Sequence, residues 1–466
     1  MDWFPTISDR AGPTYLRILD ALTDDIAAGH VRRGQQLPTH RALAKALGID
    51  VTTVTRAYRE AQSRGLTEAR VGQGTFIADT ARATVGGTMP PRGPAHLDFD
   101  LSMNLPPHPP EADLDGRIAR GIAALEREHG FGPYLNYAES GGGLQERGIA
   151  ADWLRPRIAR IDAERLAICP GAQSALAASL LALTAPGDVV LTDRLTYPGI
   201  KAAAAYARVR LIGVAMDANG MMPDALRMAI ERHAPKMLYL VPTIQNPTTA
   251  TMPQARRAEI AEIVAAHDLI LIEDDAYGLL APEHVPFAAL IPTQTVYAAS
   301  LSKCISPGLR IAFLATPDAD TNARITAALR AMLQMPVPLM AALIARWLAD
   351  GSADAIIAAI RDEAAARQKM AARALTGFAF AANRNGHHMW LEVPPAWNPA
   401  EFTQHARAHG LAAVTSDAFH VAHGVEAPPH AVRLALGAAR NRAELSHALD
   451  WLAIALRLPP PTAQVV

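Results

Sequence analysis

A segment rich in Gly and Pro, residues 79–96, divides this chain of 466 residues into a short N-terminal part and a long C-terminal part. Its sequence, DTARATVGGTMPPRGPAH, shows no hydrophobic period and has almost no large apolar residue, which is typical of an interdomain linker. Fully extended, such a linker would reach about 60 Å. We therefore predict a small domain over residues 1–78, a linker over 79–96 and a larger unit over 97–466.

Short apolar runs alternate with Ala-rich helical stretches after the linker. Runs such as Val189–Leu191, Met237–Val241 and Thr295–Ala299 have the length of buried strands, whereas Gln254–His267 has the length and composition of a helix. This alternation predicts an α/β fold with a mostly parallel sheet.

Composition and charge limit the cellular compartments and the binding partners that this protein can have. Lys and Arg total 44 against 45 Asp and Glu, so no global field draws the molecule to nucleic acid or to an anionic membrane. The two cysteines cannot form a disulfide framework, and the start, MDWFPTISDR, lacks the regions of a secretory signal. No apolar run approaches the ~18 residues of a membrane span. We therefore expect a protein of the reducing cytoplasm with no membrane partner.

The N-terminal part has the pattern of a winged helix-turn-helix. Apolar residues three or four apart predict an amphipathic helix over Tyr15–Ala28. Thr39 and Asp50 can cap the next two helices, HRALAKAL and VTTVTRAYREAQSR, which are joined by a short turn at Gly48. Leu66–Ile77 then reads as a hairpin with Gly residues at its tip.

These residues resemble the GntR-type winged helix through GQQLPTHRALA, VTTVTRAY and GQGTF. The start of the third helix offers hydroxyls and a guanidinium that can reach phosphates and base edges. The resemblance implies contacts of double-stranded DNA with five residues: Arg41, Thr52, Thr53, Arg56 and Gly74. An interaction module whose arginines are merely solvated is the alternative.

A second cluster of motifs predicts a site for pyridoxal 5′-phosphate (PLP). Lys303 follows the apolar run VYAA in the sequence SLSK, and burial there would favour the neutral amine that condenses with an aldehyde. The hydroxyls of Ser300 and Ser302, with Arg310 seven residues after the lysine, suit a phosphate. Cys304 reads as a packed small residue, and the pair His387 and His388 lacks the further ligands of a metal site.

Three more segments strengthen this prediction, and each follows an apolar run. Asp274 could pair with a pyridine nitrogen, and Asn246 with Tyr277 could hydrogen-bond the ring oxygen. The sequence CPGAQ opens a helix at Gly171, where backbone N–H groups can approach a phosphate. Strand ends of this kind are where ligands gather in open α/β sheets.

Together these segments resemble fold-type I PLP enzymes of the aspartate aminotransferase class. The resemblance implies a large subdomain and a small one mostly from about residue 320 onward. It implies Lys303 as the Schiff-base lysine, Tyr197 stacked on the ring and Arg433 on a substrate or effector carboxylate. It also implies a phosphate cradle made by Gly171, Ala172, Gln173, Ser300, Ser302 and Arg310. This sequence departs from the family pattern at Thr249, where Gly is usual, a change that concerns the local loop rather than the cofactor contacts.

The whole chain resembles the MocR subfamily of GntR regulators, in which a winged helix precedes an aminotransferase-like domain. The resemblance implies a homodimer, with winged helices that can swap between subunits, and DNA binding that responds to PLP and an amino-compound effector. Two alternatives stay open: a working aminotransferase with an accessory DNA-binding domain, and a DNA-binding scaffold whose large domain serves only dimerisation.

Overall fold

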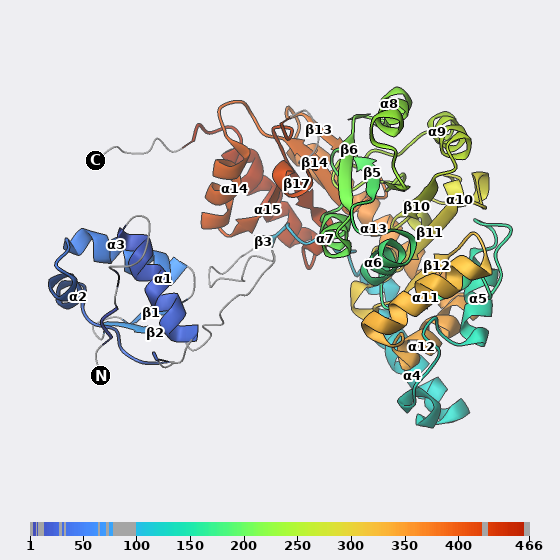
Figure 1. The fold of residues 1–466 in the computed structure, drawn as a ribbon, viewed down its shortest axis with the longest axis horizontal. Helices are drawn as coiled ribbons and strands as arrows, with labels where there is room; N and C mark the ends of the chain where they lie inside the picture. Colours follow the sequence, from blue (N-terminus) through green and yellow to red (C-terminus); the bar gives the residue numbers. More distant parts are fainter. Residues whose placement is uncertain are drawn as a thin grey trace. The chain divides into compact units, whose positions relative to one another are not determined.

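The computed structural model describes residues 3–5, 7, 14–27, 30–31, 34–63, 66–70, 74–77, 99–421 and 427–460. It groups the chain into two compact units, Met1–His96 and Leu97–Val466 (Figure 1). The predicted linker lies outside the described residues, so the predicted boundaries at 78 and 97 stay predictions.

The N-terminal unit contains the predicted helices and hairpin. They are α1 (Thr14–Ala27), α2 (His40–Leu47), α3 (Val51–Ser63), β1 (Thr67–Arg70) and β2 (Gly74–Ile77). The Thr39 side chain caps α2 by accepting from the Ala42 N–H at 3.2 Å, and Gly48 ends it with a φ of 66°. A feature absent from the prediction is a third extended segment, because Leu37 N–H donates to Thr75 O and Gln36 bridges to Phe76.

The large subdomain is built on a seven-stranded sheet in the order β4-β12-β11-β10-β9-β5-β6. The strands are β4 (Leu166–Cys169), β5 (Val189–Asp193), β6 (Arg210–Val214), β9 (Met237–Leu240), β10 (Ile270–Asp274), β11 (Thr295–Ser300) and β12 (Ala312–Ala315). All neighbours pair in parallel except β12, which runs antiparallel to β4 and β11. The prediction of a mostly parallel sheet is therefore confirmed.

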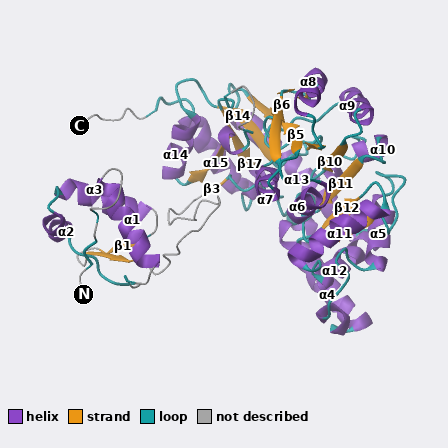
Figure 2. Ribbon diagram, in the orientation of Figure 1, coloured by secondary structure: helices purple, strands orange, loops and turns teal. Residues whose placement is uncertain are grey.

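Helices cover both faces of this sheet (Figure 2). On β9, Met237 and Tyr239 pack with α6, α7 and α11, whereas Leu238 and Leu240 pack with α8, α9 and α10. This alternation is the period of two expected of a strand buried on both faces. The helices of this subdomain are α4 (Leu114–His129), α5 (Leu144–Leu154), α6 (Ala172–Leu183), α7 (Pro198–Ala207), α8 (Pro223–His233), α9 (Gln254–Ala266), α10 (Phe287–Leu290), α11 (Ala319–Leu333) and α12 (Pro338–Ala349). A small hairpin is formed by β7 (Met216–Asp217) and β8 (Gly220–Met221).

The implied start of the small subdomain at about residue 320 stays a prediction. Around that position, α11 packs on α6, and α12 packs on α5, so both helices share the cores of the large subdomain. A separate apolar core includes the end of α13 (Ser352–Ala374) and residues beyond it, together with Phe99 and Leu101 from the start of the unit.

That second sheet is antiparallel, in the order β13-β14-β17-β16. The remaining elements of the small subdomain are β13 (Phe380–Ala382), β14 (His388–Glu392), β16 (Val414–Thr415), β17 (Ala431–Ala435), α14 (Pro399–Ala408) and α15 (Arg442–Ala455). β3 (Phe99–Asp100) joins it from the start of the unit by pairing in parallel with β15 (Leu411–Ala412).

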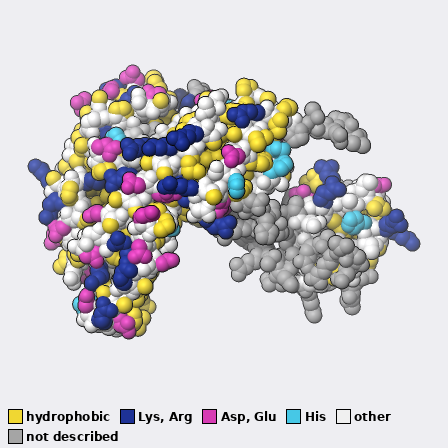
Figure 3. All heavy atoms as spheres, turned by 180° about the vertical axis from the view of Figure 1, so that it is seen from behind, with side chains coloured by type: hydrophobic (Ala, Val, Ile, Leu, Met, Phe, Trp, Pro, Cys, Tyr) yellow, Lys and Arg dark blue, Asp and Glu magenta, His cyan; other side chains and the backbone are white. Residues whose placement is uncertain are grey.

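The surface of the unit that starts at Leu97 carries both signs of charge interspersed on the face seen in Figure 3. This mixture agrees with the near-zero net charge. Among the described residues, both cysteines are free and buried. None of the helices in the described part of the chain combines the length and the hydropathy that a membrane span requires.

Candidate functional site

The predicted cofactor residues follow strands that end at one edge of the large sheet. β10 ends at Asp274 and β11 at Ser300, and the two strands are parallel neighbours. Because β12 is antiparallel, its first end lies at the same edge, and Arg310 precedes it there. At the same edge, the loops after β4, β5 and β9 carry Gly171, Tyr197 and Asn246, and Ala172 and Gln173 open α6 directly after Gly171.

Lys303 is partly buried, and its Nζ donates to the backbone oxygen of Asn104 at 2.5 Å. Burial and, to a smaller extent, the Arg433 cation lower the pKa of Lys303 to about 8, although the Asp274 carboxylate opposes both effects. A substantial fraction of neutral amine therefore exists near neutral pH, and this is the form that attacks a carbonyl.

Asp274, the residue predicted to pair with the ring nitrogen, is a buried carboxylate. Its Oδ2 accepts a hydrogen bond from the Tyr239 hydroxyl at 2.7 Å, and its Oδ1 has no hydrogen-bond partner among the described residues. Burial raises the pKa of Asp274 to about 6, although the Tyr239 hydrogen bond opposes this. A cationic ring N–H would satisfy the free oxygen and favour the ionised carboxylate.

Tyr277 lies at the centre of a buried hydrogen-bonded group. Its hydroxyl accepts from Asn104 Nδ2 at 2.7 Å and lies 3.3 Å from His388 Nδ1. His388 Nε2 in turn lies 3.1 Å from the Gln245 carbonyl, one residue before Asn246. Burial lowers the pKa of His388 to about 3, so its ring is neutral at physiological pH.

Arg433, on β17, brings the small subdomain to the same place. It is 6% exposed, and its Nη1 donates to Asn246 Oδ1 at 2.9 Å. Its guanidinium lies over the Phe419 ring at 5.0 Å. Burial lowers the pKa of Arg433 to about 10, so it stays a cation at neutral pH. Asn246 thus has a partner other than a ring oxygen in this structure.

Two of the predicted phosphate residues, Gly171 and Arg310, lie against each other. A Cβ at Gly171, which has a φ of 87°, would lie 2.6 Å from Arg310 Nη2. Arg310 also donates to Pro170 O at 2.9 Å, and the Ser302 N–H donates to Ser300 Oγ at 3.2 Å. Glycine is therefore required for the guanidinium to lie against this turn.

Tyr197 and Gln173 complete the residues named from the sequence. Burial and the Asp274 carboxylate raise the pKa of Tyr197, whereas Arg310 and Arg433 oppose that shift, so the Tyr197 hydroxyl senses all three charges. Gln173 Nε2 donates to Gly199 O at 2.9 Å.

At Thr249, where the family usually has glycine, the backbone adopts a conformation that is unfavourable for threonine. Thr249 has a φ of 64°, in the left-handed region that favours glycine. Its N–H donates to the Gln245 carbonyl at 2.7 Å, so the loop that carries Asn246 keeps a closed turn without glycine.

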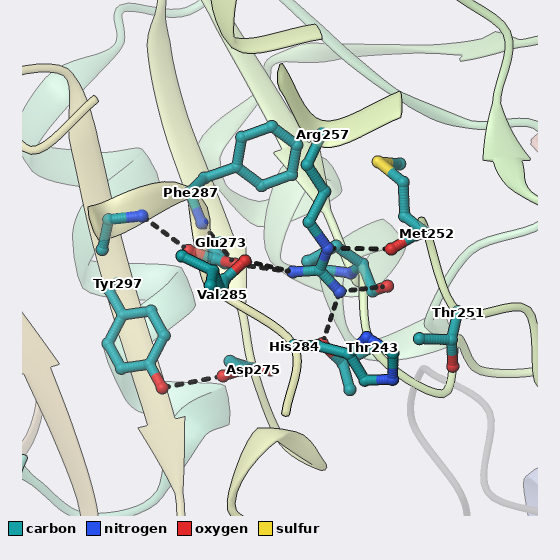
Figure 4. A network of polar contacts seen from close by, with 12 residues as sticks. Thr243, Thr251, Met252, Arg257, Glu273, Asp275, His284, Val285, Phe287 and Tyr297 are labelled. Carbon is teal, nitrogen blue, oxygen red and sulfur yellow. Dashed lines mark hydrogen bonds and ion pairs between the residues drawn. The ribbon is translucent and has the colours of Figure 1, made fainter. Parts of the chain in front are cut away.

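Two buried acids flank Asp274 in the sequence, and Figure 4 shows Glu273 and Asp275 in contact with polar partners of their own. Glu273 accepts from the backbone N–H groups of Phe287 and Ala288, each at 3.0 Å, and lies 3.7 Å from Arg257. Arg257 also donates to the Pro242 carbonyl and the Thr243 hydroxyl, both at 2.9 Å. This network therefore ties the end of β10 to the start of the loop that leads to Asn246.

Asp275 is held by a separate cation. Its Oδ2 accepts from Arg157 at 2.6 Å and from the Tyr297 hydroxyl at 2.7 Å. Burial alone would lower the pKa of Arg157, but Asp275 and Tyr297 outweigh it and raise that pKa. The charge of Asp275 is thus balanced locally, and Asp274 is left to face the site.

The structure also places the predicted DNA-binding residues. Arg41, Thr52 and Arg56 are exposed, and Thr53 is half-buried. The Thr52 hydroxyl donates to Asp50 at 2.5 Å, and the Arg56 guanidinium lies 4.1 Å from the centre of the Tyr15 ring. Gly74 opens β2 with a φ of 110°. The wing residues 71–73 lie outside the described residues.

Sequence reasoning missed Tyr239, Asn104 and the role of His388. Tyr239 lies within an apolar strand, and its only signal is that a buried hydroxyl needs a partner. Asn104 follows the linker in a stretch without period, and its contacts are with residues 173 and 199 positions away. In the described part of the chain, no group of three or more His, Cys, Asp or Glu residues is arranged to hold a metal ion.

Known protein families match both parts of the chain. The family model for aminotransferase class I and II matches residues 100–452, and that for the bacterial regulatory proteins of the gntR family matches residues 14–77. The uncharacterized HTH-type transcriptional regulator YdeF of Bacillus subtilis (strain 168) is 30% identical over 450 residues, which cover 96% of each chain. The vitamin B6 salvage pathway transcriptional repressor PtsJ of Salmonella typhimurium is 30% identical over 435 residues, covering 91% of this chain and 94% of that protein.

Among solved structures, the α-aminoadipate aminotransferase LysN from Thermus thermophilus superposes with a TM-score of 0.69. It is 24% identical, covers 77% of this chain and 92% of its own, and was solved with N-(5′-phosphopyridoxyl)-L-leucine. At this identity the likeness shows the fold alone, which confirms the prediction of an aminotransferase-type α/β fold.

The two matched domains define a DNA-binding regulator with an aminotransferase-type domain, in a family of PLP-dependent proteins. The chain belongs to the aminotransferase class I and II family and, along its length, to the HTH-type regulators that join a GntR domain to this fold, as predicted for the MocR type.

Removal of the Glu273 carboxylate will destabilise the large subdomain. In Glu273→Ala, the buried Arg257 loses its counter-charge and two backbone N–H groups lose their acceptor. We expect the free energy of unfolding in urea to fall by about 3–5 kcal/mol. Glu262→Ala, which removes an exposed acid of α9, serves as control and should change it by less than about 0.5 kcal/mol. Equal effects of the two variants would contradict this account.

The lowered pKa of Lys303 predicts a pH dependence for PLP capture. With a pKa of about 8, raising the pH from 7 to 8 increases the neutral fraction of Lys303 about fivefold, with a plateau above pH ~9. The rate at which the apo protein develops the cofactor's visible absorption should follow this curve. Nα-acetyl-lysine in solution should instead gain about tenfold per pH unit up to pH ~10. If the rate of PLP capture by the protein also rises about tenfold per pH unit up to pH ~10, the pKa of Lys303 is that of an ordinary lysine.

Proposed function

We propose that this regulator binds PLP through Lys303 and changes its affinity for double-stranded DNA when an amino compound enters the same site. The observation that carries the proposal is the partly buried Lys303 amine beside Asp274, whose Oδ1 is buried and has no partner among the described residues. These residues fit the cofactor, because an unpaired buried carboxylate oxygen calls for a cationic donor.

When bound, PLP supplies an aldehyde that condenses with amines and a ring that withdraws electrons. Lys303 would hold the aldehyde carbon, and Asp274 would keep the ring nitrogen protonated. Tyr239 orients Asp274 and leaves one oxygen free for that task. Tyr277 and Asn246 would hold the ring oxygen, and Tyr197 would stack on the ring. The phosphate would lie among Gly171, Ala172, Gln173, Ser300, Ser302 and Arg310.

Arg433 supports an effector that carries a carboxylate as well as an amine. Its guanidinium is a buried cation without a carboxylate partner among the described residues, and its Nε has no hydrogen-bond partner there. A planar fork of this kind binds a carboxylate through two parallel hydrogen bonds. An amino acid has both required groups.

Dimer formation is supported by an exposed apolar surface near η2 (Gly132–Leu135). η2 packs on α12, and Ala138 N–H lies 3.0 Å from Met335 Sδ, which joins this region to the end of α11. The exposed apolar side chains in these segments are Phe131, Leu135, Tyr137, Leu144, Met332, Leu333 and Val337. Groups of exposed apolar side chains on neighbouring segments are typical of interfaces, and we propose a second copy of the chain as the partner.

The regulatory step is a shift between two populations. An amino compound can change DNA affinity only if it binds one domain arrangement more tightly than the other. The alternative, a working aminotransferase, is supported by Lys303 and Asp274. Both are residue types that such an enzyme needs, and both lie at one edge of the sheet.

Lys303→Ala tests the cofactor role. Because the substitution removes the amine, we expect the visible absorption band with PLP to disappear and DNA affinity to stop responding to PLP. Lys236→Ala, which removes an exposed lysine, should behave like the wild type. A band that persists in Lys303→Ala would refute the proposal. Steady-state amino transfer to a 2-oxo acid is measured alongside, because rapid turnover would favour the enzyme.

Arg41→Ala tests the DNA contact, with a duplex selected from a random pool by the wild-type protein. Loss of one phosphate contact should weaken binding and reduce the slope of log Kd against log salt by about 1. Arg373→Ala removes an exposed arginine of α13 and controls for net charge alone. Equal effects of both variants on that slope would exclude a specific contact at Arg41.

A further inference from the structure

Two cations of the proposed site donate to the backbone of one short segment, Ser102–Asn104. Lys303 Nζ donates to the Asn104 carbonyl, and Arg433 Nη2 donates to the Ser102 carbonyl, each at 2.5 Å. These are the two side chains that the cofactor and the effector carboxylate would engage. The segment and the ligands therefore compete for the same donors.

The 102–104 segment is held at both ends by the small subdomain and by its own turn. Before it, Phe99 N–H donates to Gly410 O at 2.9 Å, and Ala435 N–H donates to Leu101 O at 2.8 Å. The Asp100 carboxylate accepts from the Ser102 N–H at 3.0 Å and so sets the turn. After it, the Leu105 carbonyl lies so close to Gly437 that a Cβ there would collide with it.

The Asn104 side chain fastens the segment to the site itself. Its Nδ2 donates to the Tyr277 hydroxyl at 2.7 Å and lies 3.4 Å from His388 Nδ1. Asn104 is only 8% exposed. The Asn104 side chain thus holds the Asn104 and Ser102 carbonyls where they accept hydrogen bonds from Lys303 and Arg433.

The segment also follows the predicted linker almost directly. That linker ends at His96, and β3 begins at Phe99. The residues that respond to ligand are therefore separated from the path to the winged helix by only a few positions in sequence.

Ligand chemistry weakens both hydrogen bonds. Condensation of the Lys303 amine with the cofactor aldehyde forms a C=N bond and releases water, which leaves the nitrogen at most one hydrogen. A carboxylate on Arg433 would bring an opposite charge and two parallel hydrogen bonds, whereas the Ser102 carbonyl is neutral and accepts only one. Each event therefore favours release of the 102–104 segment.

We propose that the 102–104 segment couples the ligand site to the linker, with Asn104 as its positioning residue. This inference rests on the proposed function. Occupation of Lys303 and Arg433 releases the segment, and the released segment changes the start of β3, where the linker joins the unit.

Hydrogen–deuterium exchange of the full chain tests this coupling with N-(5′-phosphopyridoxyl)-L-leucine as the probe. We expect the amides of residues 99–105, and that of Ala435, to exchange about tenfold faster with the probe bound. The probe has no aldehyde, so it leaves the Lys303 amine uncondensed and reports on the Arg433 bond alone. The analogue N-(5′-phosphopyridoxyl)-3-methylbutylamine lacks the carboxylate and should have little effect, whereas PLP, whose aldehyde would take up the Lys303 amine, tests the Lys303 bond separately. Unchanged or slower exchange, with calorimetry showing the probe bound, overturns the inference.

Variants separate the segment's role from cofactor binding. Asn104→Ala should exchange several-fold faster at residues 99–105 without any probe, and its affinity for the selected DNA should shift in the direction that the probe shifts the wild type. Met103→Ala, on the same segment, removes a side chain that is 42% exposed and should match the wild type. Asn104→Leu, of similar volume, serves if the alanine variant does not fold.

The outcomes also distinguish the two proposals. If neither PLP nor the probe binds the folded wild-type chain, the proposed function fails, and the coupling fails with it. If both bind and Asn104→Ala exchanges and binds DNA as Met103→Ala does, only the coupling fails.

Discussion

The site depends on a lysine and a carboxylate that have little access to water and whose opposite charges act on each other. Burial favours the neutral forms of both Lys303 and Asp274, and their opposite charges resist that tendency. The result is an amine and an acid whose pKa values both lie near neutrality. Groups poised in this way can exchange protons and accept a new partner without a large energetic cost.

The surrounding scaffold keeps this balance by dealing with the neighbouring charges separately. Three acids follow one another at the end of β10, yet only Asp274 faces the site. Glu273 is turned toward Arg257 and two backbone N–H groups, whereas Asp275 is bound by Arg157 and Tyr297. Each flanking acid thus has its own buried partner, while Asp274, Lys303, Arg310 and Arg433 remain as the charged groups of the site.

The site is also shared between two subdomains and the start of the unit. Lys303 and Asp274 come from the large sheet, Arg433 comes from β17 of the small one, and Asn104 comes from the segment that follows the linker. An arrangement of this kind suits a sensor, because a ligand that engages all three parts changes how they are held together. The same arrangement would also serve an enzyme, and this is why rates of amino transfer and DNA affinity must be measured together.

The sequence by itself determined the order of the domains, the strands and the residues at their ends. Lys303, Asp274 and Gly171 could be predicted because each follows an apolar run, and strand ends of a parallel sheet share one edge. Only the tertiary structure decided that Tyr239 orients Asp274, that Asn104 reaches Lys303 and Tyr277, and that α11 and α12 pack with the large subdomain. Such contacts join residues far apart in the chain, and local periodicity carries no information about which distant side chain will satisfy a buried polar group.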